Sequence, residues 1–286
     1  MSCMSIKIND PLTLVIFGAT GDLYKNKLSL ALFNLFILGL LPKEFRVFGF
    51  ARRPMTNLEF QNFTRDNVLS KNEERNKEKL DDFLQHFTYI QGDLENLESF
   101  KNLSKALTQS DAQKKFCSNK LFYLAVPPTL YAAIFKNISN AGLTVPCAPS
   151  SKGQSLAWTR VLVEKPFGKD IKEAERLDQM LGELFDESQV FRIDHYLAKE
   201  TMQNILAFRF TNGVFESLWN HKNIECVRIV FHEAGTLVTR GAFYDGIGAL
   251  RDVGQNHMLQ MLALMAMENP KSQSAEKIQD TRRKVL

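Results

Sequence analysis

The stretch that decides the fold is LTLVIFGATGDL, residues 12–23. It begins with a run rich in branched apolar side chains, as expected of a strand that is buried on both faces. A glycine turn follows over residues 18–22, and residues 23–38 have helical character that Gly39 ends. Arg46–Phe50 predicts a second short strand. A strand, a glycine turn, a helix and a strand in this order open a doubly wound α/β domain.

The remaining pattern predicts two domains. Further strands are expected at 120–126 and 159–163, with a helix over 129–141 between them. These elements complete a Rossmann-type doubly wound parallel sheet over residues 1–187. Residues 188–286 are expected to form an α+β domain. Its two predicted elements are a half-exposed antiparallel strand, residues 225–232, where apolar side chains alternate, and a long apolar helix, residues 252–267.

Composition is that of a globular protein. The 286 residues can bury a sizeable core, and 44% hydrophobic with 24% charged residues is ordinary for a folded, water-soluble chain. The net charge of +4 fits an anionic small-molecule substrate or merely a solvated surface rich in lysine. Because Lys and Arg are dispersed along the chain, no nucleic-acid partner is indicated.

Cysteine usage and hydropathy bear on the compartment. Four cysteines stand far apart without C-x-x-C spacing, which predicts neither a disulfide framework nor a zinc site and fits a reducing cytosol. No His/Cys/Asp cluster has the spacing of metal ligands. Residues 1–10 lack a signal-peptide core, and the longest apolar run, 28–41, is too short to span a membrane. We expect a cytoplasmic protein with no metal and no membrane partner.

The glycine turn is a candidate nucleotide site. Gly18 and Gly21 stand three apart without the third glycine of the G-x-G-x-x-G pattern, so the turn alone is a weak signal. A buried strand before it and a helix after it provide the backbone amides and the helix N-terminus that bind a pyrophosphate. A plain strand-to-helix turn is the alternative.

The end of the second strand bears on which cofactor fits. Dinucleotide folds that use NAD place an acid there for the ribose 2′-hydroxyl. This strand runs instead into Ala51, Arg52 and Arg53, and Lys27 on the first helix adds further charge. Two guanidinium groups suit a 2′-phosphate and favour NADP. Arginines placed there for solubility alone are the alternative.

Two further segments carry candidate chemistry. The strand over 160–163 delivers Glu164 and Lys165 to the carboxyl edge of the sheet, where ligands bind in such folds, although a lysine there is often only solvated. His257 shares a helix face with apolar residues and so also fits a core position. Its polar neighbours, among them Asp252, favour a general base, and Asp194 is a candidate partner to fix its tautomer.

Four motifs line up in order: GATGDL at 18–23, EKPFG at 164–168, RIDHYLAKE at 192–200 and RDVGQNH at 251–257. Together they resemble the NADP-linked glucose-6-phosphate dehydrogenase family, from about Leu12 to the C-terminus. The resemblance implies that this chain oxidises glucose 6-phosphate to the 6-phosphogluconolactone, the first step of the pentose phosphate route. In this family residues 195–199 form the phosphate-binding motif, and their presence argues against a related sugar oxidoreductase that takes unphosphorylated glucose.

The resemblance also implies domain and residue roles. Residues 1–187 are expected to be the NADP-binding domain, and residues 188–286 are expected to be a partial substrate-binding domain. His257 is the expected base for the C1 hydroxyl, and Asp194 orients it. The sugar is expected to be bound by Lys165, His195, Tyr196, Lys199, Glu233 and Asp252. The NADP site is expected to comprise Gly18, Ala19, Thr20, Gly21, Asp22, Leu23, Lys27, Arg52, Tyr123 and Lys165.

Two departures from the family leave an alternative open. Ala198 stands where the family usually has glycine, within the phosphate-binding motif. Family chains continue well past the equivalent of Leu286, so we expect a truncated member. The family implies a homo-oligomer, but its dimer surface belongs to the part that is expected to be missing, so a homo-oligomer and a chain without that surface both stay open. The alternative function is therefore a catalytically inactive protein of the same ancestry that binds NADP or a partner.

Overall fold

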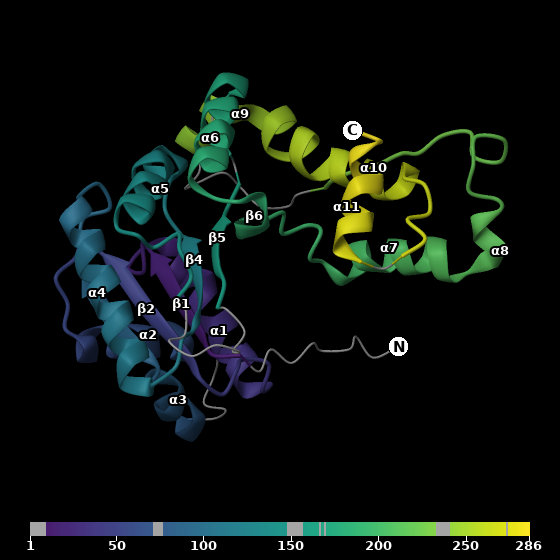
Figure 1. The fold of residues 1–286 in the computed structure, drawn as a ribbon. Helices are drawn as coiled ribbons and strands as arrows, with labels where there is room; N and C mark the ends of the chain where they lie inside the picture. The colour runs from purple at the N-terminus through teal and green to yellow at the C-terminus, as the bar shows by residue number, and fades with distance from the viewer. Residues whose placement is uncertain are drawn as a thin grey trace. The chain divides into compact units, whose positions relative to one another are not determined.

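The computed structural model describes residues 10–70, 77–147, 157–165, 167–168, 170–232, 241–272 and 274–286. The chain divides into two compact units, residues 1–193 and 194–286, labelled by element in Figure 1. From the sequence the division was expected near residue 187. The short strand that follows that position belongs to the sheet of the first unit.

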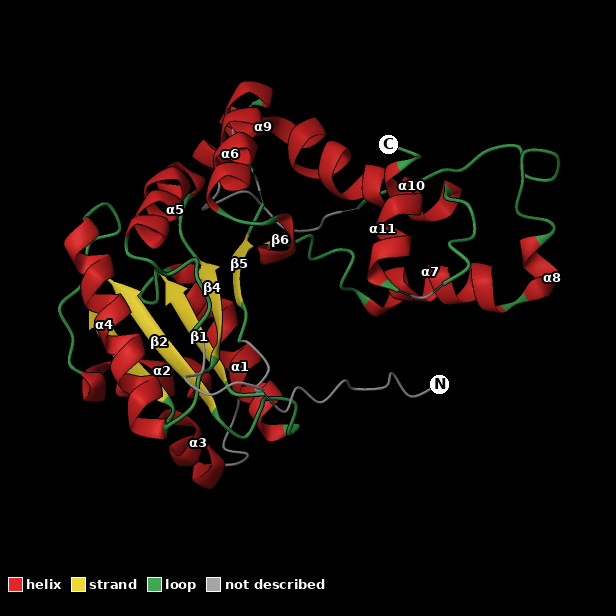
Figure 2. Ribbon diagram, in the orientation of Figure 1, coloured by secondary structure: helices red, strands yellow, loops and turns green. Residues whose placement is uncertain are grey.

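The first unit is built on six parallel strands. They are β1 (Leu12–Phe17), β2 (Phe45–Ala51), β3 (Phe87–Gln91), β4 (Asn119–Leu124), β5 (Thr159–Val163) and β6 (Val190–Arg192). Their order in the sheet is β3-β2-β1-β4-β5-β6. In Figure 2 the arrows of β1, β2 and β4 lie side by side and point the same way. This order is that of a doubly wound dinucleotide fold, and it confirms the predicted fold class of this unit.

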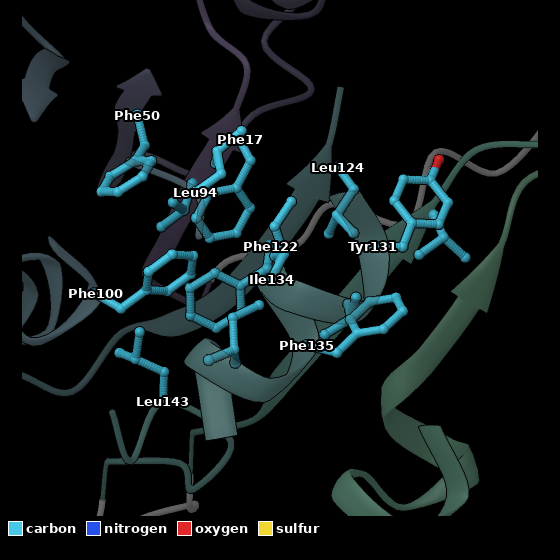
Figure 3. Close-up of a cluster of buried hydrophobic side chains, with 14 of the residues drawn as sticks. Phe17, Phe50, Leu94, Phe100, Phe122, Leu124, Tyr131, Ile134, Phe135 and Leu143 are labelled. Atoms are coloured by element: carbon cyan, nitrogen blue, oxygen red, sulfur yellow. The ribbon is translucent and has the colours of Figure 1, made fainter. Parts of the chain in front are cut away.

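Helices cover both faces of the sheet. The helical segments of this unit are η1 (Tyr24–Leu28), α1 (Ser29–Ile37), α2 (Asn57–Leu69), α3 (Lys77–Leu84), α4 (Leu97–Lys114), η2 (Pro128–Leu130), α5 (Tyr131–Asn140), α6 (Ile171–Leu184) and η3 (Glu187–Gln189). One apolar cluster packs α4, α5 and α6 on one face, and a second packs α1, α2 and α3 on the other. Part of the first cluster is shown in Figure 3.

Alternation along the central strands explains the two cores. In β1, Val15 and Phe17 enter the first cluster, while Ile16 between them enters the second. In β2, Phe48 and Val47 divide in the same way. Since successive side chains of a strand point to opposite faces, a strand that is apolar at nearly every position must be covered on both sides. This is why the run at 12–17 predicted a central strand.

The cysteine prediction was wrong. Cys117 and Cys147 form a disulfide, with Cα atoms 5.6 Å apart and a sequence separation of 30. Cys117 comes just before β4, and Cys147 lies on the connection that leads from α5 to β5. Because neighbouring parallel strands begin at the same edge of the sheet, both cysteines reach that edge, which spacing along the sequence does not reveal. Cys226 is free and exposed.

The second unit is helical. Its segments are α7 (Glu200–Thr211), α8 (Gly213–Glu216), α9 (Gly241–Ala249), η4 (Leu250–Met258), α10 (Leu259–Ala266) and α11 (Ala275–Arg283). The helix predicted over 252–267 is therefore two segments, because its first part, η4, is a π-helix. Met202, Leu264 and Met267 form the buried core of this unit. No helix in the described part of the chain is long and apolar enough to cross a membrane.

The predicted antiparallel sheet does not appear in the described part of this unit. Residues 224–232 have no regular secondary structure, and most of them are exposed. The alternation of Val227, Ile229 and Phe231 satisfies the side-chain pattern of a strand, but a strand also needs a backbone partner. None of the described segments of this unit forms a ladder with it.

Candidate functional site

The glycine turn after β1 has a backbone that only glycine tolerates. Gly18 has a φ of +81°, and a Cβ placed on it would lie 2.5 Å from the carbonyl oxygen of Ala125. The Gly18 amide donates to the carbonyl of Phe50 at 2.9 Å, and the Gly21 amide donates to the Gly18 carbonyl at 2.9 Å. The turn therefore passes close against the ends of β2 and β4. The segment that follows, η1, is a π-helix.

A cavity of about 330 Å³ opens at this turn, at the carboxyl ends of β1, β2 and β4. Four of the residues predicted for the cofactor line it, namely Gly18, Thr20, Gly21 and Arg52. Arg53 lines it as well. Ala19 lies fully buried beneath the turn. The other predicted cofactor residues do not line this cavity, namely Asp22, Leu23, Lys27, Tyr123 and Lys165.

The lining of this cavity suits the phosphate groups of a phosphorylated dinucleotide. Close-packed backbone at Gly18, which a side chain would fill, and two arginines contribute to it. No acid is among the described residues that line it, so the ribose-binding carboxylate of NAD-specific folds is not found there. This arrangement agrees with the charge argument for NADP.

Tyr89, on β3, supports the arginine pair, and no sequence pattern pointed to it. Its hydroxyl lies within hydrogen-bonding distance of the carbonyls of Ala51 (3.0 Å) and Arg53, which share its single proton. Burial raises the pKa of Tyr89, so the phenol stays protonated and remains a donor. These bonds fix the backbone that presents Arg52 and Arg53 after β2. Only the pairing of β2 with β3 brings this tyrosine into place.

Two tyrosines hold Glu164, which follows β5. Tyr123 on β4 donates to the Glu164 carboxylate, and Tyr131 donates to the Glu164 carbonyl at 3.1 Å. Tyr123, predicted to bind the cofactor, is thus placed by the structure against Glu164. Lys165 comes next in the chain, half-buried at the carboxyl end of β5. The sequence pattern places Lys165 correctly at the sheet edge and does not identify Tyr131.

The second unit brings Asp194 and His257 together. The Nδ1 atom of His257 lies 2.8 Å from Oδ1 of Asp194, and the two side chains are 5% (Asp194) and 8% (His257) exposed. Because a carboxylate can only accept, this contact holds the imidazole proton on Nδ1 and leaves Nε2 with a lone pair. The pair therefore has the geometry of a general base with its orienting acid.

Short turns over residues 194–199 arrange the motif around this pair. The Tyr196 amide donates to Oδ1 of Asp194 at 3.1 Å, and the rings of His195 and Tyr196 lie 4.8 and 4.0 Å from that of His257, centroid to centroid. The Nζ atom of Lys199 lies 3.7 Å from the centre of the Tyr196 ring, directly before α7. Of the residues predicted to bind phosphate, His195 and Tyr196 thus lie beside the His257 ring, and Lys199 lies over the Tyr196 ring.

Of the two remaining residues predicted to bind the sugar, Asp252 and Glu233, the structure describes only one. Asp252 is half-buried in η4, on the same π-helix as His257. Glu233 lies outside the described residues. Arg282, which the sequence did not single out, lies near the pair: burial lowers the pKa of its guanidinium, and the charge of Asp194 acts in the opposite direction. Among the described residues no group of three or more His, Cys, Asp or Glu side chains is placed to hold a metal ion.

A parallel sheet of this order, a glycine turn at its first strand and a buried Asp–His pair define a two-unit α/β protein of the dinucleotide-binding class. Residues 15–204 match the family model "Glucose-6-phosphate dehydrogenase, NAD binding domain", and residues 206–286 match "Glucose-6-phosphate dehydrogenase, C-terminal domain". The chain belongs to the glucose-6-phosphate dehydrogenase family.

Individual relatives agree with this membership. The cytoplasmic glucose-6-phosphate 1-dehydrogenase 6 of Arabidopsis thaliana is 43% identical over 279 residues, which is 96% of this chain and 53% of the relative. The enzyme of Schizosaccharomyces pombe is 37% identical over the whole chain and 55% of its own length. This chain therefore spans about half the length of the curated relatives that it matches.

Solved structures show the same fold. A glucose-6-phosphate dehydrogenase in complex with its substrate glucose 6-phosphate superposes with a TM-score of 0.86 at 35% identity, covering 97% of this chain and 56% of that one. The enzyme from Mycobacterium avium gives a TM-score of 0.82 at 32% identity, covering 96% and 56%. Both matches extend over both units of the chain.

Proposed function

We propose that this chain oxidises glucose 6-phosphate to 6-phosphoglucono-1,5-lactone with NADP as the hydride acceptor. The observation that carries the proposal is the buried Asp194–His257 pair, because transfer of the C1 hydrogen as hydride requires a base for the proton of the C1 hydroxyl. When such a base takes the proton of the C1 hydroxyl, the C1–O bond becomes the carbonyl of the lactone.

The residues that take up the proton of the C1 hydroxyl lie in the second unit. The C1 hydroxyl donates its proton to Nε2 of His257 as the C1 hydrogen leaves as hydride. The carboxylate of Asp194, at 2.8 Å from Nδ1, holds the ring in place and stabilises the imidazolium that forms. General-base assistance of this kind contributes roughly 10²–10⁴-fold to the rate.

Binding of the sugar phosphate is assigned to the turn before α7. Lys199 supplies a cationic donor, His195 supplies a ring N–H, and Tyr196 supplies a hydroxyl. Charge-assisted hydrogen bonds to phosphate oxygens are strong and directional, so anchoring this end of the substrate fixes the position of C1. Asp252 and Glu233 are assigned to sugar hydroxyls, and Lys165 is assigned to both substrate and cofactor.

The first unit is assigned to NADP, which when bound accepts the hydride. Backbone amides of the turn over residues 18–21 and the helical segment after it would hold the pyrophosphate, and Arg52 would pair with the 2′-phosphate. The fit rests on the cavity at Gly18 and on the two arginines at its rim.

The test is NADPH formation, followed by absorbance, after glucose 6-phosphate and NADP are added to the purified chain. We expect turnover, and we expect His257→Asn to lower kcat by roughly 10²–10⁴-fold with little change in sugar binding. Exchange of His257 without loss of rate would refute the base assignment. Binding of NADP without any turnover by the folded chain would support the alternative, a nucleotide-binding protein without catalysis.

We further propose a cytoplasmic location and a homo-oligomeric state. Relatives at 43%, 44% and 41% identity are named as cytoplasmic forms, while chloroplastic forms reach 40%. The paired Cys117 and Cys147 mean that cysteine usage no longer supports this location. Cell fractionation tests the compartment, and light scattering tests the assembly. Recovery in plastids, or a monomer at all concentrations, would contradict the respective proposal.

A further inference from the structure

Tyr131 is a buried tyrosine whose hydroxyl the proposed reaction does not use. It begins α5 and is 1% exposed, and its ring packs against Phe135 with 5.9 Å between the centroids. In Figure 3 its oxygen points out of the apolar cluster that surrounds the ring. That oxygen donates a 3.1 Å hydrogen bond to the backbone carbonyl of Glu164. The ring thus belongs to the core, while the hydroxyl reaches the segment after β5.

Glu164 is held at a second point by Tyr123, which donates to its carboxylate. Tyr123 lies on β4, which pairs with β5, so the neighbouring strand supplies this contact. Burial raises the pKa of both phenols, and the negative charge of Glu164 raises them further. Both tyrosines are therefore protonated donors throughout the neutral range, and one residue is fixed through its side chain and its carbonyl at once.

The carbonyl that Tyr131 holds belongs to the peptide bond that joins Glu164 to Lys165. Since a peptide unit is planar and rigid, fixing its oxygen also fixes the plane from which the Lys165 backbone begins. We propose that Tyr131 is a positioning residue for Lys165: its hydroxyl sets the direction in which the lysine leaves the carboxyl end of β5. The inference rests on the proposed function, which assigns Lys165 to the cofactor and the substrate.

The substitution Tyr131→Phe removes the hydroxyl and keeps the ring that fills the core. Because a single intramolecular hydrogen bond is worth a modest amount, we expect NADPH affinity, measured by fluorescence titration, to fall roughly three- to ten-fold. In a Lys165→Met background the same substitution should cause no further loss, since the side chain that it positions is gone. An equal loss in both backgrounds would mean that Tyr131 acts on the fold in general, and it would overturn the inference.

Thr13→Val is the matched control. Thr13 is likewise buried, near the amino end of β1 and away from the cavity at Gly18, and its hydroxyl makes a 2.7 Å hydrogen bond with the hydroxyl of Ser118. Thermal unfolding should show a comparable loss of stability in both variants, whereas NADPH affinity should fall only in Tyr131→Phe. If the unaltered chain binds no NADPH, the cofactor assignment is refuted and this inference with it. If the chain binds NADPH equally well with Phe at position 131, the inference alone is refuted.

Discussion

Gly18 meets two constraints that no other residue type meets together. Its φ of +81° lies in the left-handed region, and its missing Cβ leaves room for the carbonyl of Ala125 at the end of β4. The sequence pattern predicted a tight turn here from the glycine and its flanking strand and helix. It did not predict the close approach of β4, because that contact joins residues that are distant in the sequence. Glycine is therefore required at position 18 by the backbone geometry as well as by the proposed function.

Substitution of Gly18 by alanine should damage both the fold and nucleotide binding. The left-handed backbone alone costs an L-residue about 1–2 kcal/mol, and the Cβ at 2.5 Å from the Ala125 oxygen forces the turn to move. We expect a lower free energy of unfolding in urea and a loss of NADPH affinity of roughly ten-fold or more, since the turn lines the cavity assigned to the nucleotide.

Gly182→Ala serves as the control for that experiment. Gly182 lies within α6, and a Cβ added to it would meet nothing within 4 Å. Since alanine is the better helix former, this variant should gain about 0.5–1 kcal/mol of stability and bind NADPH as the unaltered chain does. Equal behaviour of the two variants would contradict the role assigned to the turn.

At the scale of elements, a buried ionic network joins α4 to the sheet. Asp111 on α4 contacts Arg46 of β2 at 2.5 Å and Lys120 of β4 at 2.7 Å, and it accepts a hydrogen bond from Ser118 at 2.8 Å. Burial on its own would raise the pKa of Asp111, but the bonds from Lys120, Arg46 and Ser118 outweigh it and lower the pKa overall. The network holds one helix and two strands in register.

Asp111→Asn should lower the free energy of unfolding by about 3–5 kcal/mol at neutral pH, because it leaves buried cations without their counter-charge. An acid whose pKa is lowered by folding contributes stability above its unfolded pKa of about 3.9. That contribution is lost as pH falls through the lower, folded value. The difference between the unaltered chain and the variant should therefore be constant near neutral pH and shrink below about pH 4.

The matched control for this network is Asp81→Asn. Asp81 pairs with Arg65 at 2.6 Å, but the two side chains are 62% (Asp81) and 37% (Arg65) exposed. An exposed pair contributes only about 0–1 kcal/mol, so this variant should unfold nearly as the unaltered chain does. Urea unfolding of both variants across pH checks the prediction, and a pH-independent cost at Asp111 would contradict it.

Element prediction succeeded where one segment carries its own signal. The strands at 12–17 and 159–163 have the predicted ends, because each is an apolar run bounded by turn residues or a new helix. No element was predicted for α4, although Phe100, Leu103 and Leu107 form a helical stripe after the Asn96 cap. The strand at 225–232 was wrong because alternation describes a face and does not supply a partner strand.

The sequence also predicted only part of the candidate site. Asp194 and His257 were proposed as a pair from their motifs, and the structure places them 2.8 Å apart although 63 residues separate them along the chain. Tyr89 and Tyr131 were missed because each acts on a neighbouring strand or on the segment after it. No spacing along the chain encodes such contacts. Residues that carry the chemistry were thus more readily found than residues that hold them.

At the scale of the whole molecule, the two units differ in how much apolar surface they bury. The first has a continuous cluster on each face of its sheet. In the second, the described core consists of Met202, Leu264 and Met267 with partly buried neighbours, while Val214 and Leu250 are 75% and 73% exposed. Because burial of apolar surface is the main favourable term in folding, the first unit should supply most of the stability of the chain.

Residues 1–193, produced alone, should therefore fold and bind NADPH with an affinity within about three-fold of the full chain, since every group assigned to the pyrophosphate and the 2′-phosphate lies in that unit. This fragment should not reduce NADP, because Asp194 and His257 are outside it.

Residues 194–286 alone should show no cooperative unfolding, since a chain of this size with so small a core is marginal. Circular dichroism melts and NADPH titration of the two fragments check both statements. Cooperative unfolding of the second fragment would show that this unit is stable by itself and would contradict the prediction. Failure of the first fragment to bind NADPH, while the full chain binds it, would show that nucleotide binding requires both units.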